Sequence, residues 1–100
     1  MRIIAWRNLA AYARDHPRAD TALHRWAVAT YNGEWRSTAE VVAAFSTAKT
    51  VSRDRVRFEI DGGNFRLIVA YNFRRQIAFV KFIGTHAEYD RVDAATVEMF

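Results

Sequence analysis

The protein has 100 residues, of which 51% are hydrophobic and 26% charged, and it carries a formal net charge of +4. This length supports one hydrophobic core and the composition is that of a globular chain, so we expect a single domain over residues 1–100 and exclude a disordered protein. The absence of cysteine excludes disulfides, thiolate metal ligands and a cysteine nucleophile. No apolar run approaches the roughly 20 residues of a membrane span, and arginines interrupt the N-terminal apolar stretch too early for a signal peptide. We therefore expect a soluble cytoplasmic protein without a membrane partner.

The positive charge is concentrated in one segment. Residues 49–81 hold eight basic and three acidic residues, whereas the rest of the chain holds seven basic and eight acidic ones. A basic stretch of this kind favours a polyanionic partner such as nucleic acid. A solvated basic face without any ligand would have the same charge, so charge alone does not establish binding.

The N-terminal half is expected to be mainly helical. Met1–Ile4 is predicted to be a short edge strand, and apolar residues at helical spacing then predict one helix on each side of Pro17. The apolar faces of these two helices are Trp6, Leu9, Ala10 and Ala13 in the first, and Leu23, Trp26, Ala27 and Thr30 in the second. Asp20 is expected to cap the start of the second helix, which is expected to end at Asn32-Gly33. Ser37 and Glu40 form a capping-box pattern that predicts a third short helix.

After Lys49 the hydrophobic pattern alternates with a period of two. It predicts strands over Arg55–Ile60, Phe65–Tyr71 and Gln76–Ile83. The segment Asp61–Asn64 is a strong hairpin signal because its two glycines accept the positive φ that tight turns need. Arg74-Arg75 is a weaker signal for the second turn.

Two-residue loops at both turns would separate the strand residues into two distinct faces. One face is entirely apolar or aromatic: Val56, Phe58, Ile60, Phe65, Leu67, Val69, Tyr71, Ala78, Val80 and Phe82. Helices packed on that face would give an α+β fold. The other face mixes charged and apolar groups: Arg55, Arg57, Glu59, Arg66, Ile68, Ala70, Ile77, Phe79, Lys81 and Ile83. Arg66 and Lys81 are diagonal neighbours on this register, but a three-residue second loop would place them on opposite faces.

The last predicted strand leads into a group of polar residues. Thr85 and Glu88 form a second capping box, which predicts a short C-terminal helix. His86, Tyr89 and Asp90 would share one face of it, near the free N–H groups that attract phosphate. A histidine in a first helical turn is also common as a surface or capping residue, so this trio alone does not establish a catalytic site. No zinc-ligand spacing, phosphate-binding glycine loop or serine-hydrolase motif is present, so no metal site and no cofactor are expected.

Two segments together resemble a known family. They are Asp61–Ile68 (DGGNFRLI) and Phe82–Asp90 (FIGTHAEYD), and they are similar to the HigB family of RelE-like mRNA interferases from type II toxin–antitoxin systems. The resemblance extends over nearly the whole chain, and the closing THxEYD run is its specific part. Phe65 departs from the family pattern, in which tyrosine is frequent at this position.

The resemblance implies a fold and a mechanism. The fold is a small RelE-like α+β domain, with N-terminal helices packed on one face of an antiparallel sheet and a short C-terminal helix. The activity is ribosome-associated cleavage of mRNA, which inhibits translation and is neutralised by a HigA-like helix-turn-helix antitoxin. Cleavage by the neighbouring 2′-OH needs a base, an acid and cations for the phosphorane charge. Family correspondence places Arg66 and Lys81 as the cations, and His86 and Tyr89 as acid–base candidates, with Asp90 orienting His86.

Further residues are expected to hold the RNA: Arg55, Arg57, Asn64, Arg74 and Arg75. Two other functions remain open on the sequence. One is a ParE-like toxin that acts on DNA gyrase without nuclease chemistry, which would not need the group His86, Tyr89 and Asp90. The other is a non-catalytic nucleic-acid-binding module, which should lose affinity, rather than turnover, as charges are removed.

Overall fold

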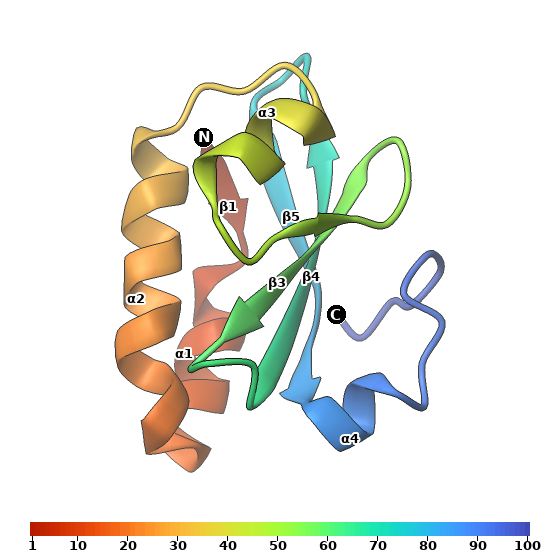
Figure 1. Ribbon diagram of the computed structural model, residues 1–100. Coiled ribbons are helices and arrows are strands. Elements are labelled where there is room, and N and C mark those ends of the chain that lie inside the picture. Colours follow the sequence, from red (N-terminus) through yellow and green to blue (C-terminus); the bar gives the residue numbers. More distant parts are fainter.

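Two helices lie against one face of a five-stranded sheet (Figure 1). The computed structural model describes residues 1–100. The helices are α1 (Trp6–Asp15) and α2 (Pro17–Asn32), and the strands, in order across the sheet, are β1 (Arg2–Ile4), β5 (Ile77–Thr85), β4 (Phe65–Asn72), β3 (Arg55–Ile60) and β2 (Lys49–Thr50). Helix α3 (Thr38–Ala44) packs on β2 and β3, and the single-turn helix α4 (His86–Tyr89) follows β5. This is the expected α+β fold with a short C-terminal helix.

The helix boundaries follow local capping chemistry. Helix α2 begins at Pro17, so the prediction that Asp20 caps it is wrong, because the residue before the first turn is His16. Proline suits a first helical position, where no backbone N–H is needed. The predicted end of α2 at Asn32-Gly33 is confirmed. The start of α3 is also confirmed, since the Ser37 side chain accepts a hydrogen bond from the Glu40 backbone N–H.

The sheet is mixed rather than purely antiparallel. Strand β1 is the edge strand predicted near the N-terminus, but it pairs in parallel with β5. The expectation of an antiparallel sheet holds for β2 to β5 only. The physical reason is connectivity, because β1 leads into the helices instead of into a hairpin, and parallel strands can be joined only by such long crossovers. The Met1 ammonium is held in place by the carbonyl oxygens of Thr30 and Gly33, at 2.9 and 2.8 Å.

The first hairpin has the predicted register and the second departs from it at one point. Strands β3 and β4 pair as expected from a two-residue loop, in which Gly62 and Gly63 have φ of 63° and 91°. Strands β4 and β5 also start in the expected register, but a β-bulge after Val69–Val80 shifts the pairing by one residue. Beyond the bulge Phe82 lies opposite Ile68, on the face away from the core. The prediction that Phe82 belongs to the helix-covered face is therefore wrong, and Ile83, 1% exposed, takes its place in the core.

The core fills the space between the two helices and the sheet. Its members come from both layers, among them Leu9, Leu23 and Trp26 from the helices, and Phe58, Leu67, Val69 and Ile83 from the strands. Burial of this apolar surface is the main favourable contribution to folding. None of the helices is long and apolar enough to cross a membrane.

Candidate active site

The sheet face opposite α1 and α2 carries five charged side chains: Arg55, Arg57 and Glu59 on β3, Arg66 on β4 and Lys81 on β5. We call these residues the basic face. It is covered in part by the C-terminal tail (residues 91–100), which runs on the far side of the sheet from the helices (Figure 1). Each cation of the basic face has an acidic partner within the chain, but the four cations share only two carboxylates, Glu59 and Glu98, so the face keeps an excess of positive charge.

Arg66 is a buried cation at the hairpin end of the central strand. Its residue is 7% exposed, its Nη1 donates to the Gly63 carbonyl oxygen at 2.6 Å, and its Nη2 lies 3.5 Å from Glu59 Oε1. Its Nε is buried without a hydrogen-bond partner. The guanidinium is therefore held in a fixed position by Gly63 and Glu59.

Lys81 lies at the β-bulge on the same face as Arg66, as predicted. Its Nζ donates to Glu98 Oε2 at 2.7 Å and lies 5.6 Å from the centre of the Phe79 ring. The structure does not bring the two cations into contact, because Arg66 is held by Glu59 and Lys81 by Glu98. Two separate positive sites therefore occupy the face.

Helix α4 presents the predicted acid–base group beside Arg66. The capping box is confirmed, with Thr85 N–H donating to Glu88 Oε1 at 2.8 Å and Glu88 N–H donating to Thr85 Oγ1 at 3.2 Å. The backbone hydrogen bond from Thr85, followed by the bond from its side chain, lowers the pKa of the Glu88 carboxyl below its ordinary value. The His86 backbone N–H donates to the Asn64 carbonyl oxygen at 3.1 Å, which fixes the start of α4 against the first hairpin.

The three side chains of the group differ in their surroundings. His86 Nδ1 lies 3.1 Å from Asp90 Oδ2, and both side chains are more than half exposed. The Tyr89 ring lies against the sheet, with its centre 6.0 Å from the Arg66 guanidinium carbon and 6.3 Å from the Phe82 ring. The arrangement places a phenol beside one buried cation, and a histidine–carboxylate pair on the same short helical turn as that phenol. These are the groups that acid–base chemistry on a phosphate requires.

The five residues expected to hold RNA fall in different places. Arg57, 15% exposed in its side chain, lies 3.8 Å from Glu59, and Asn64 lies in the first turn, where its amide donates to Asp61 at 3.1 Å. Arg74 and Arg75 are exposed at the β4–β5 turn, the end of the sheet away from α4 (Figure 1). Arg55 lies under the C-terminal tail. Its residue is only 7% exposed, because the tail covers the guanidinium.

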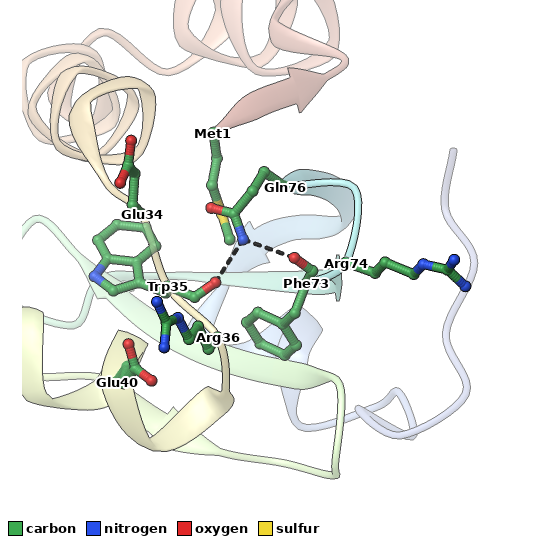
Figure 2. Close-up of a pocket in the computed structure, with 8 residues that line it drawn as sticks. All are labelled: Met1, Glu34, Trp35, Arg36, Glu40, Phe73, Arg74 and Gln76. Atoms are coloured by element: carbon green, nitrogen blue, oxygen red, sulfur yellow. Dashed lines mark hydrogen bonds between the residues drawn. The ribbon is translucent and has the colours of Figure 1, made fainter.

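A hollow of about 600 Å³ lies at the Arg74 end of the sheet, remote from α4. Figure 2 shows Gln76 in this hollow, donating to the carbonyl oxygens of Trp35 and Phe73 at 2.6 and 2.7 Å. Its charged lining is balanced, with Arg36 and Arg74 offset by Glu34 and Glu40. None of the residues predicted to be catalytic lines it.

Three contributors to the site were missed by sequence reasoning. Glu98 binds two cations of the basic face, and nothing in its neighbourhood in the sequence signals this. Glu59 was placed on the face, but its role as the partner of Arg66 was not predicted. Tyr12 stacks on His16 with a centroid distance of 3.9 Å, and burial, with a smaller effect of the Glu88 charge, raises its pKa to about 12. No group of three or more histidine, aspartate or glutamate side chains is arranged to hold a metal ion.

Residues 19–92 match the family model of the HigB toxins, described as the RelE-like toxic component of a toxin–antitoxin system. The matched span includes every strand except β1 and every site residue predicted from the sequence, but it ends before most of the C-terminal tail. No curated protein matches the chain.

Proposed function

Because the chain belongs to the HigB family of RelE-like toxins, whose members act in toxin–antitoxin systems, we propose that it is an endoribonuclease that cleaves mRNA on the ribosome and inhibits translation. The observation that carries the proposal is the position of Tyr89 over the buried Arg66, on the single-turn helix that also begins the His86–Asp90 pair. The match to HigB toxins favours this activity over an attack on gyrase.

The proposed reaction needs only groups of the chain and of the RNA. The 2′-oxygen of one nucleotide attacks the adjacent phosphorus, a base takes its proton, and the bond from phosphorus to the 5′-oxygen breaks as an acid protonates that oxygen. His86 and Tyr89 carry the two proton transfers, and Asp90 holds the imidazole through the 3.1 Å contact. Arg66 stabilises the negative charge that develops on the phosphorane, and Lys81, at a separate position on the same face, adds positive charge that attracts the RNA.

Single-turnover cleavage of mRNA on programmed ribosomes tests these roles. If either side chain transfers a proton, His86→Ala or Tyr89→Phe should slow cleavage by about 10²- to 10⁴-fold with ribosome binding retained. His24→Ala is a matched control, since His24 also lies in a helix near a carboxylate, Asp20, but outside the site. Wild-type rates in both site variants would refute the proton-transfer roles and leave His86 as a first-turn surface residue.

The family implies an antitoxin partner. We propose that this partner is a HigA-like helix-turn-helix protein encoded beside this gene, and that the toxin acts in the cytoplasm on translating ribosomes. Induced expression of the toxin alone should arrest growth with loss of protein synthesis, and co-expression of the adjacent gene should restore it. Unimpaired growth with abundant folded toxin would contradict the proposal.

A further inference from the structure

The C-terminal tail is attached to the basic face mainly by polar contacts. The Arg55 Nη1 donates to the carbonyl oxygens of Ala94 and Val97, at 3.2 and 2.8 Å, and the Met99 backbone N–H donates to the Lys81 carbonyl oxygen at 2.9 Å. Met99 and Phe100 remain 51% and 46% exposed, so the end of the tail contributes little apolar burial. Polar contacts at a partly solvated surface are individually weak.

Glu98 is the acidic group of this attachment. Its Oε1 accepts from Arg55 Nη2 at 2.8 Å and its Oε2 accepts from Lys81 Nζ at 2.7 Å. The hydrogen bond from Lys81 is the largest of the effects that hold the Glu98 pKa below its ordinary value, so the group is a carboxylate at neutral pH. Each of its two oxygens meets a cation from a different strand, one on β3 and one on β5. The same spacing suits two oxygens of a phosphodiester.

We propose that Arg55 and Lys81 form a phosphate-binding subsite for the RNA backbone, and that Glu98 occupies this subsite in the free protein. RNA and the tail then compete for the same two cations. The inference rests on the proposed function for the identity of the ligand. It also accounts for the position of the C-terminal tail over Arg55, which lies on the same face as Arg66. The span that matches the HigB toxins ends at Val92, so the contact made by Glu98 lies outside it.

The competition is expected to be modest in size. The Glu98 side chain is 55% exposed and the Lys81 side chain 21%, so solvent screens their ion pair and the tail can be displaced. A ligand that binds only the free form of a site has its apparent Kd raised by the reciprocal of the fraction of the site that is free. Freeing the subsite should therefore tighten RNA binding by about 3- to 10-fold.

Fluorescence anisotropy with a short single-stranded RNA tests the subsite without any need for cleavage. We expect Glu98→Gln to bind the RNA about 3- to 10-fold more tightly than the wild type. Glu34→Gln is the matched control, because it changes the net charge by the same amount at an exposed position with no ion pair. Its affinity should change less than twofold. The gain of Glu98→Gln should disappear when Arg55→Gln is added to it.

The proposed subsite would be refuted if Glu98→Gln and Glu34→Gln bound the RNA with equal affinity. It would also be refuted if Glu98→Gln bound the RNA more weakly than the wild type. A variant lacking residues 98–100 should bind RNA with the same gain in affinity as Glu98→Gln. This second variant controls for a direct effect of the glutamine side chain on RNA binding. Ribosomal cleavage by the same proteins separates this inference from the proposed function. If Glu98→Gln binds RNA more tightly but no variant cleaves mRNA, the subsite is supported and the nuclease activity is refuted. If the proteins cleave mRNA but Glu98→Gln shows no gain in affinity, the nuclease activity is supported and the subsite is refuted.

Discussion

Replacing Arg66 by alanine should slow cleavage of ribosome-bound mRNA by about 10²- to 10³-fold, equivalent to roughly 3–4 kcal/mol of transition-state stabilisation. The magnitude follows from the position of the guanidinium, which is buried at the end of a central strand and held in place by Gly63 and Glu59. A preorganised charge of this kind acts mainly where negative charge develops. The rate of a single turnover on programmed ribosomes measures the effect, since this assay separates chemistry from binding.

Two variants sharpen the Arg66 test. Arg66→Lys keeps the charge but loses the planar fork of donors, so it should recover only part of the rate. Arg57→Ala removes the other arginine beside Glu59 and should weaken binding while leaving the rate of bound substrate nearly unchanged. A wild-type single-turnover rate for Arg66→Ala, in a protein with an unchanged melting temperature, would show that the site has been misplaced.

Three further predictions concern the frame around the site. Gly84→Ala should destabilise the fold by about 1–3 kcal/mol, seen as a lower melting temperature, because its Cβ would lie 2.6 Å from the Phe82 ring. Arg74→Ala should weaken RNA binding modestly and flatten its salt dependence, with no change in the rate of bound substrate, as anisotropy at several salt concentrations would show. The hydrogen bonds from Thr85 lower the pKa of Glu88, so the ionised Glu88 carboxylate stabilises the start of α4 at neutral pH. This stabilisation should be lost as the pH falls through the lowered pKa, and the NMR shifts of the α4 backbone amides would report the loss. An α4 that titrates only near neutral pH would contradict that assignment.

Local chemistry explains which parts of the fold were predictable. The Asp61–Asn64 turn determines the β3–β4 register, because its glycines allow only a tight loop and the strands on either side alternate cleanly. The helix starts at Ser37 and Thr85 were likewise readable, since each cap depends on residues three positions apart. These features need no knowledge of the tertiary structure.

The features that were missed depend on distant parts of the chain. The bulge at Lys81 has no local signal, because Phe82 and Ile83 are both apolar and either one could face the core. The parallel pairing of β1 depends on the path through two helices. Glu98 meets Arg55 across a separation of 43 residues, which no spacing rule describes. The shared face of Arg66 and Lys81 was therefore predictable from the sequence, but the pairing of these cations with Glu59 and Glu98 was not.

The measurement that tests the central claim most directly is analysis of the RNA ends left by the purified protein on programmed ribosomes. Attack by the neighbouring 2′-oxygen predicts cleavage that leaves a 2′,3′-cyclic phosphate on one fragment and a 5′-hydroxyl on the other. It also predicts that a single 2′-deoxy substitution at the cleaved nucleotide abolishes the reaction. An intact message, or equal cleavage of the deoxy-substituted message, would contradict the mechanism built on Arg66, His86 and Tyr89.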